Sequence, residues 1–522
     1  MTMKMEQHLD ESVRPQDDFF TYANSNWLND NPMPDTESRW GTFHVLREEA
    51  LENMRNIYEG LQSKKDINSI EKQARDFYYT GINFDKFEER HWSVLGEIMS
   101  TITATDGPSS LSNVIGQLHR RGANVPWALY VGTDENDATK YVAHLYQGGL
   151  SLPDRDYYLS SDKEMVKARD KYKDFLGNAY DLYSDIAASK EKFVDTIFSF
   201  EHKIAKIQRT NSQLRDVEAN YHPISFEDLQ NTYANIDWQE YANGANLSYT
   251  KNISHDQPEF MEFINKSFVD LPVEDWHIYL KWQLLRQYLP VISKKTAKIY
   301  FEFFGKVING TKKDQPHWKK VVYCMDHAMG ENVGQLYVGE HFPEASKKAV
   351  LQMVDEISNT FAGRIEDLDW MGDATKAYAI KKLRNMKVLI GYPDKWRDFT
   401  SLRVARDSFV ENLLEAEMFN HDFELSRLGQ PNSRDQWYMS PQTVNAYHDP
   451  SRLVICFPAG ILQAPFFDRE YSMAQNFGGI GMVIGHELTH AFDDQGSQFD
   501  ADGNVRSWQT VSEKKSFAKP CT

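Results

Sequence analysis

Cysteine is scarce in this chain, and long apolar runs are absent from it. Only 3 of the 522 residues are cysteines, and they stand far apart, at Cys324, Cys456 and Cys521. The odd number and the wide spacing predict neither a disulfide framework nor a C-x-x-C metal site, and they favour a reducing compartment. No stretch of about 18 apolar residues occurs, and the first residues lack the apolar segment of a signal peptide. We therefore expect a cytoplasmic protein with no membrane span.

Basic residues are also fewer than acidic residues. The chain carries 58 Lys and Arg residues against 76 Asp and Glu residues, a formal net charge of -18 at pH 7. Nucleic acids and anionic membranes both require basic patches on a partner. We therefore expect neither nucleic acid nor membrane as a partner. The length allows two or more domains, each with its own core.

Helical periodicity dominates what is present. From residue 45 to about residue 390, apolar side chains recur near the 3.6-residue spacing of amphipathic helices, and core packing is the expected role of these stripes. Three such stripes contain Val45, Leu46, Leu51 and Met54; Phe193, Ile197, Phe198, Phe200 and Ile204; and Val350, Met353, Val354, Ile357 and Phe361. Residues 453–458 instead form a short run rich in β-formers. This run predicts a strand whose edge could receive an extended peptide.

The motif that carries chemistry is H-E-x-x-H, formed by His486, Glu487 and His490. A helix over residues 480–494 would place the two histidines on one face, where they can share one Zn²⁺ ion. Glu487 would then act on a water activated by the metal. The five-residue pattern also occurs by chance, but here an apolar segment surrounds it and Gly496 follows it, as helix ends prefer. We expect one zinc ion per chain.

A third ligand decides the class of zinc hydrolase. Metzincins continue with H-E-x-x-H-x-x-G-x-x-H, but Asp493 and Gly496 occupy the positions of that glycine and that final histidine. The remaining large class uses a glutamate from a later helix. Glu513 is the only glutamate after His490, and its neighbours are typical of a solvated helix. We do not expect Glu513 to bind the metal.

Motifs along nearly the whole chain resemble the neprilysin family of zinc metallopeptidases, and most of all its bacterial cytoplasmic branch, oligoendopeptidase O. The resemblance is carried, in order, by residues 17–28, 336–338, 368–371, 386–396, 444–447, 457–467 and 478–496. It implies a mainly α fold with an α+β catalytic part, in which a large helical domain faces an incomplete thermolysin-like zinc peptidase domain. The implied division is a helical domain over residues 1–395, a connecting segment over 396–440 and the partial catalytic domain over 441–522.

The resemblance also implies roles for individual residues. His486 and His490 are the zinc ligands, and Glu487 is the general base that later passes its proton to the leaving amine. Asn445 and the backbone of Ala446 hold the substrate main chain as an added strand. Four residues line an apolar pocket for the residue after the scissile bond: Ile461, Phe466, Met482 and Val483. Judged by the residues alone, ordinary core packing is the stronger interpretation for these four.

The chain departs from the family after His490. The family's third ligand and an orienting aspartate stand in an E-N-x-A-D segment, and nothing after His490 resembles it. The nearest match, residues 330–334, precedes the zinc helix and belongs to a helical-domain motif. The family's C-terminal Arg and His are absent as well, and residues 519–522 depart from its pattern. We therefore expect a truncated chain with weak zinc binding, a tendency to unfold or aggregate, and activity at least about a thousandfold below that of a complete relative.

Together with the motif, the resemblance implies a zinc-dependent metalloendopeptidase that hydrolyses internal bonds of oligopeptides, on the amino side of apolar residues. The main alternative is a catalytically inactive, truncated relative that only binds peptide or zinc weakly. A zinc hydrolase with a non-peptide substrate is the second alternative. Asn445, Ala446 and the predicted strand edge favour a peptide over other substrates.

Overall fold

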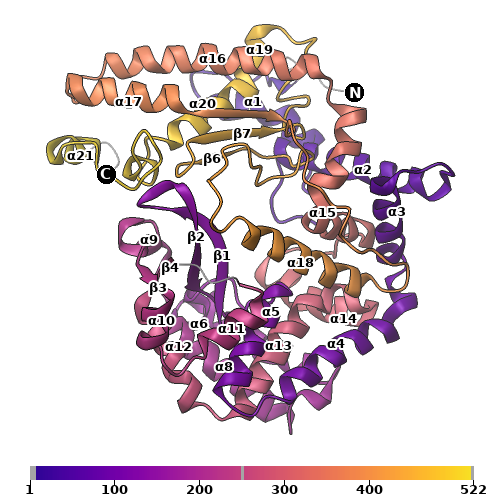
Figure 1. Cartoon of the computed structure of the whole chain (residues 1–522). Helices are drawn as coiled ribbons and strands as arrows, with labels where there is room; N and C mark the ends of the chain where they lie inside the picture. Colours follow the sequence, from indigo (N-terminus) through magenta and orange to yellow (C-terminus); the bar gives the residue numbers. More distant parts are fainter. Residues whose placement is uncertain (1–7, 248–251, 519–522) are drawn as a thin grey trace.

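The computed structural model describes residues 8–247 and 252–518. Residues 1–7, Cys521 and the unusual ending at 519–522 lie outside this range, so what the sequence predicts of them stays a prediction. Helices make up most of the described chain, which confirms the mainly α fold (Figure 1). In the orientation of Figure 1 the elements form a lower part and an upper part, with α18 (Phe409–Ser426) between them.

The lower part is built around α13 (Val273–Ile292). Side chains are buried all around this helix, Trp276 and Trp282 among them, as expected of a helix enclosed by others. The surrounding elements are α4 (Glu88–Thr103), α5 (Pro108–Arg120), α6 (Asp156–Leu159), α7 (Lys163–Tyr180), α8 (Lys190–Ile207), α9 (Asn211–Leu214), α10 (Phe226–Thr232), α11 (Trp238–Ala245), α12 (Pro258–Asp270), α14 (Lys294–Tyr300) and a π-helical segment (Phe301–Ile308).

A β-hairpin in the lower part was not predicted from the periodicity. Strands β1 (Trp127–Asp134) and β2 (Asp137–Gln147) pair antiparallel, and the sheet continues from β2 through β4 (Asn252–His255) to β3 (Pro223–Ser225). The tip of the hairpin reaches the upper part, where the Val505 N–H donates to the Glu135 carbonyl at 2.7 Å. This hydrogen bond joins the two parts at a segment that follows the predicted zinc helix in the chain.

The remaining α-helices lie at the top and along the upper right of the molecule in Figure 1, and together they form the upper part. They are α1 (Phe19–Asp30), α2 (Thr42–Ser63), α3 (Ser69–Ile82), α15 (His317–His341), α16 (Glu344–Glu366), α17 (Asp373–Asn385), α19 (Met473–Gly478), α20 (Ile480–His490) and α21 (Val511–Ala518). The three predicted apolar stripes lie on α2, α8 and α16, and most of their members are buried. The buried members are Leu46, Leu51, Met54, Phe193, Ile197, Phe200, Ile204, Val350, Met353 and Val354.

A three-stranded sheet supports the candidate site. Its order is β5–β7–β6, with β5 parallel and β6 antiparallel to β7. The strands are β5 (Lys387–Gly391), β6 (Tyr447–Asp449) and β7 (Val454–Pro458). β7 confirms the strand predicted over residues 453–458, and all of its residues are buried, as in a strand covered on both faces. Because β5 precedes residue 395, the upper part takes residues from both sides of the expected domain boundary.

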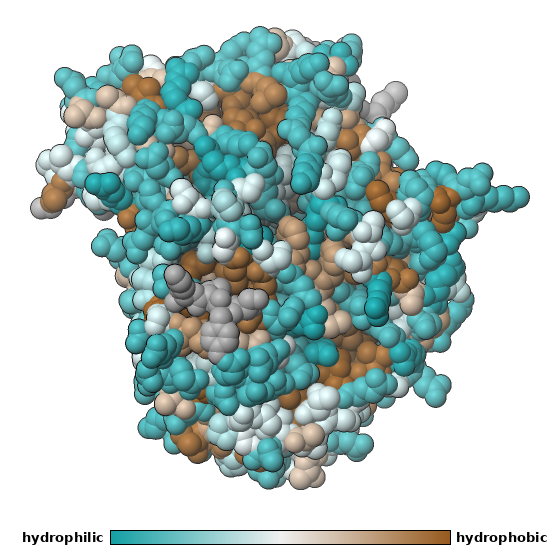
Figure 2. All heavy atoms as spheres, in the orientation of Figure 1, coloured by the Kyte–Doolittle hydropathy of each residue, from teal (hydrophilic) through white to brown (hydrophobic). Residues whose placement is uncertain are grey.

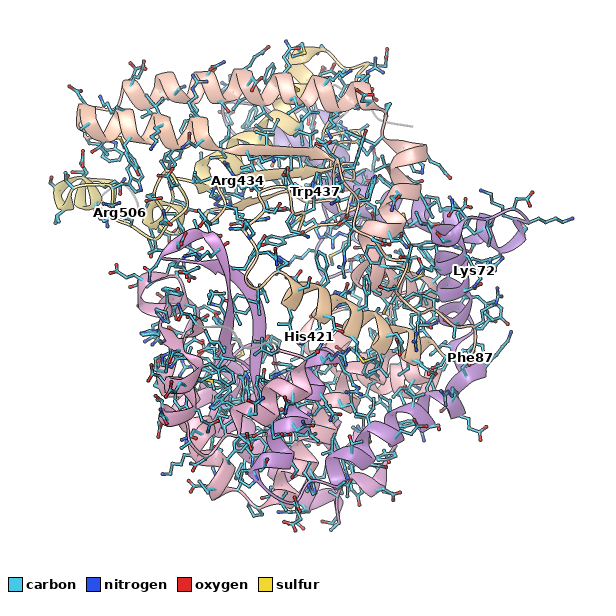
Figure 3. The ribbon with its side chains drawn as sticks, in the orientation of Figure 1. Lys72, Phe87, His421, Arg434, Trp437 and Arg506 are labelled. Carbon is cyan, nitrogen blue, oxygen red and sulfur yellow. The ribbon has the colours of Figure 1, made fainter. Side chains whose placement is uncertain are left out.

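The segment after α18 packs against this sheet. Trp437 clusters with Leu389, Val454 and Cys456, while a guanidinium nitrogen of Arg434 donates to the backbone carbonyls of Asn385 and Leu453. Figure 3 labels both Arg434 and Trp437 in this segment. The cluster fixes the chain just before it reaches Asn445 and β6.

The face drawn in Figure 2 is covered mainly by hydrophilic residues, and its apolar residues gather in separate patches. Among the residues that the structure describes, no helix is both long enough and apolar enough to cross a membrane.

Close packing of α5 on α11 generates a first prediction. A Cβ atom added at Gly116 would lie 2.3 Å from the Tyr241 carbonyl oxygen, so Gly116→Ala must push the two helices apart. We expect its free energy of unfolding to fall by about 1–3 kcal/mol in denaturant titrations. Gly96 of α4 has nothing within 4 Å of the added atom, so Gly96→Ala is a matched control that should be neutral or slightly stabilising. Equal losses in both variants would contradict the close packing.

Candidate active site

Helix α20 carries the H-E-x-x-H motif but is shorter than predicted. It spans Ile480–His490, whereas the sequence suggested a helix over residues 480–494. The chain turns after Ala491, and Gly496 returns to pack against the end of the helix. A Cβ atom on Gly496 would lie 1.9 Å from the His490 carbonyl oxygen, so the turn requires a glycine at this position. The predicted end of the helix was therefore wrong by about one turn.

The two histidines of the motif face each other. Their Nε2 atoms are 3.0 Å apart, which confirms that His486 and His490 project from the same side of α20. His486 is exposed, and the His490 side chain is 41% exposed, so both imidazoles remain accessible. Because a Zn–N bond is about 2.0–2.1 Å long, one ion can reach both nitrogens.

Asp493 orients His490. Its Oδ2 atom accepts a hydrogen bond from His490 Nδ1 at 2.8 Å, and its Oδ1 atom accepts from the backbone N–H groups of Gln495 and Gly496 at 3.0 and 2.7 Å. Donation from Nδ1 leaves the lone pair on Nε2, the atom that faces His486. No such role was predicted for Asp493 from the sequence. Its position three residues after the second histidine was the available signal.

Glu487 is buried beside the two histidines. The residue is only 6% exposed, and this burial raises the pKa of its carboxyl group to about 7, although His490 acts in the opposite direction. A carboxyl group with a pKa near neutrality can exchange a proton with a reacting group.

The donor set fits a metal only in part. Two imidazole nitrogens converge, and their second-sphere carboxylate is in place. Among the residues described here, no group of three or more His, Cys, Asp or Glu side chains is arranged to hold a metal ion. The third ligand that this class of zinc site requires is therefore not supplied by the described part of the chain.

Glu513 is engaged elsewhere. Its carboxylate accepts hydrogen bonds from the backbone N–H groups of Gly372 and Thr510, both at 2.8 Å, and from the hydroxyl group of Thr375 at 3.1 Å. It thus closes the start of α21 and ties this helix to the start of α17. The sequence match at residues 330–334 lies within α15, where Glu331 accepts from the backbone N–H of Arg397. Neither glutamate contacts the histidine pair.

The predicted substrate clamp lies at the edge of the sheet. Asn445 is exposed and Ala446 is buried, and both stand immediately before β6, which pairs with β7 alone among the described strands. A Cβ atom on Gly460 would lie 2.4 Å from the Gln442 carbonyl oxygen, so the loop after β7 packs closely against the clamp segment. A cavity of about 610 Å³ opens beside Asn445.

The four predicted pocket residues divide into two groups. Ile461, Phe466 and Val483 are 0%, 6% and 5% exposed and belong to the main apolar core. The Phe466 ring lies 4.5 Å from the ring of Phe43 of α2, which adds a contact that the sequence did not predict. Met482 is 57% exposed and precedes His486 by one helical turn on the same face. Only Met482 therefore shares the open face of the histidine pair.

Comparisons with known proteins agree with this arrangement. A profile of peptidase family M13 matches residues 15–393, and a second profile of the same family matches residues 445–521. The chain belongs to peptidase family M13. It is 32% identical to endothelin-converting enzyme 1 from Homo sapiens, over 98% of this chain and 68% of that protein. The predicted family resemblance is confirmed, and this M13 peptidase is a metalloendopeptidase.

Solved structures share its fold. The Mycobacterium tuberculosis zinc metalloprotease Zmp1, in complex with an inhibitor, matches this M13 peptidase with a TM-score of 0.92 at 32% identity, over 99% of this chain and 78% of that one. PepO from Lactobacillus rhamnosis HN001 matches with a TM-score of 0.85 at 23% identity, over 97% and 80%. These matches confirm the architecture of a large helical domain combined with a thermolysin-like domain.

The placement of Glu513 generates a second prediction. Hydrogen bonds, first of all from the Thr510 hydroxyl group, lower the pKa of Glu513 to about 2 from its usual 4.5. Because the pKa is lowered in the folded chain, the stability that the carboxylate contributes is present above about pH 4.5 and is lost as the pH falls through about 2. We expect Glu513→Gln to lower the free energy of unfolding at pH 7 by about 1–3 kcal/mol.

The same variant should leave zinc affinity unchanged when a chelator competes for the metal, because Glu513 lies away from His486 and His490. A parallel loss of zinc binding would show that Glu513 is a ligand after all.

Proposed function

We propose that this M13 peptidase is a zinc-dependent enzyme that hydrolyses internal bonds of oligopeptides. The observation that carries the proposal is the 3.0 Å approach of His486 Nε2 to His490 Nε2 beside the buried Glu487. His486 and His490 would hold the metal. A bound zinc ion would act as a Lewis acid toward the peptide carbonyl. One ion per chain is the proposed stoichiometry, because the H-E-x-x-H motif occurs once in the sequence.

Glu487 is the proposed general base. Its carboxylate would take a proton from the attacking water and later pass it to the leaving amine. Burial raises its pKa to about 7 in the metal-free chain. Asp493 would keep the His490 ring in place, because its carboxylate holds the Nδ1 hydrogen and is itself held by two backbone N–H groups.

A peptide is the proposed substrate because the site lies along a strand edge that no other described strand occupies. Asn445 and Ala446 lead into β6, and an extended peptide that pairs with this edge would place its main chain beside α20. In this arrangement Met482 would form the rim of the apolar pocket for the residue after the scissile bond. Ile461, Phe466 and Val483 would form its buried wall, in keeping with cleavage on the amino side of apolar residues.

A weakly binding, inactive relative is the second candidate. One observation favours it: the described residues supply two imidazoles and no third side chain that could complete a metal site. Two imidazoles leave the ion with fewer protein ligands than catalytic zinc sites usually have. Measurements of zinc affinity and of hydrolysis therefore separate the two candidates.

Zinc binding is the first of these measurements. We expect one zinc ion per chain by equilibrium dialysis, and at least about a tenfold lower affinity in His490→Ala, because the pair is reduced to one imidazole. His448→Ala, which changes a partly buried histidine of β6, should bind zinc as the unchanged chain does. Equal affinity in His490→Ala and the unchanged chain would exclude the proposed metal site.

Peptide hydrolysis tests the role of Glu487 as the general base. Glu487→Gln keeps the shape of the side chain but cannot accept a proton, so we expect zinc to be retained and hydrolysis of an internally quenched peptide to fall by about 10²–10⁴-fold. Glu470→Gln, at an exposed position, serves as the matched control and should behave as the unchanged chain. Turnover that survives in zinc-loaded Glu487→Gln protein would refute the assignment, and an unchanged chain without turnover would favour the inactive candidate.

We also propose a cytoplasmic location and peptides, rather than nucleic acids or membranes, as partners. The support is the net charge of -18 and the unpaired state of the two cysteines that the structure describes, Cys324 and Cys456. Burial raises the pKa of Cys324 to about 12 and that of Cys456 as well, which disfavours the thiolate form of both side chains.

A further inference from the structure

Lys382 of α17 is a buried cation that the proposed reaction does not use. Its side chain is fully buried, and its Nζ atom donates to the backbone carbonyls of Ala491, Gly496 and Phe499 at 2.8, 2.7 and 2.7 Å. Burial lowers the pKa of Lys382 to about 7, while Asp500 and Asp493 favour the charged form. An ammonium group has three N–H donors and a neutral amine only two, so the three carbonyl acceptors match the ammonium form.

These three carbonyls span one segment, residues 491–499. Ala491 stands at the end of α20, where the carbonyl groups lack partners within the helix and the helix dipole is negative. Gly496 and Phe499 stand on the returning chain. The ammonium group therefore binds both ends of the turn that contains Asp493, whose carboxylate holds His490.

Packing alone does not explain a lysine at this position. The buried side of α17 is otherwise formed by Thr375, Ala379 and Leu383, where a small or apolar residue is sufficient. Burial of a charged group is costly unless its hydrogen bonds are fully satisfied. The rings of Phe492 and Trp508 flank the ammonium group, with centroids 5.7 and 5.6 Å from Nζ, and add favourable cation–π contacts.

We propose that Lys382 is a positioning residue for His490. It holds the turn of residues 491–499 in the one conformation that lets Asp493 orient the His490 ring. The inference rests on the proposed function for the role of His490 as a metal ligand. The orientation of the ring then depends on a chain of contacts from Lys382 through the turn to Asp493 and on to Nδ1.

The test compares Lys382→Met with Lys381→Met. Lys381 is the adjacent residue on α17, and its side chain is 54% exposed, with Nζ 4.0 Å from Asp502, so it is a matched control. Two readouts are needed: amide hydrogen exchange of residues 491–499 in the metal-free protein, and zinc affinity in competition with a chelator. We expect Lys382→Met to speed exchange in this segment and to lower zinc affinity by about 10–100-fold, the usual effect of losing an outer-shell partner. Lys381→Met should change neither.

A double variant tests the route of the effect. If Lys382 acts through Asp493, Lys382→Met combined with Asp493→Asn should bind zinc no more weakly than the weaker single variant. Independent, multiplying losses would overturn the proposal. If Lys382→Met does not fold, Lys382→Gln is used in its place, because the amide keeps two donors. We then expect a smaller increase in exchange and a smaller loss of zinc affinity.

Two further outcomes distinguish a failure of the positioning role from a failure of the metal assignment. If exchange increases but zinc affinity is unchanged, while His490→Ala abolishes zinc binding, Lys382 is only structural and the proposal is wrong. If His490→Ala binds zinc as the unchanged chain does, the metal assignment is wrong, and the positioning role is excluded together with it.

Discussion

The turn after α20 is the constraint on which the candidate site depends. In a helix continued to residue 494, the N–H groups of Gln495 and Gly496 would be drawn toward helical carbonyls, that of Ala491 among them. Because the helix ends at His490, these N–H groups donate to Asp493 instead, and the Ala491 carbonyl is free to accept from Lys382. One change of backbone direction thus fixes an orienting carboxylate and creates a binding site for a buried cation.

Local patterns predicted one part of the site and could not predict the other. His486 and His490 were found because helical geometry relates residues four apart, whatever surrounds them. Lys382 was not found, because its partners are backbone carbonyls more than a hundred positions away and no side-chain pattern records them. A lysine on the buried stripe of α17 was the only signal. The parallel pairing of β5 with β7 is equally non-local, because it joins strands that lie on either side of the expected boundary at residue 395.

The proposed substrate chemistry rests on the position of β6. Among the described strands β6 is bonded to β7 alone, so its outer N–H and C=O groups are available for pairing with another main chain. Recognition through the main chain is indifferent to sequence, and selectivity must then come from side-chain pockets. Of the four residues that the sequence placed in such a pocket, three serve the core at the same time. These three residues can therefore belong to the core and also line a pocket, because the wall of a pocket is the outer surface of a core.

The turn that holds Asp493 is also the point where the lower part meets the candidate site. Arg215 forms a bidentate ion pair with Asp494, at 2.7 and 2.5 Å, and Gln498 bonds to the backbone of Arg215 and Val217. The ion pair is about half exposed and contributes little free energy by itself. Its location matters more than its strength, because it acts on the residue next to Asp493. Any separation of the lower and upper parts must break these bonds, all of which end on the segment that orients His490. The geometry of the histidine pair is therefore coupled to the contact between the two parts.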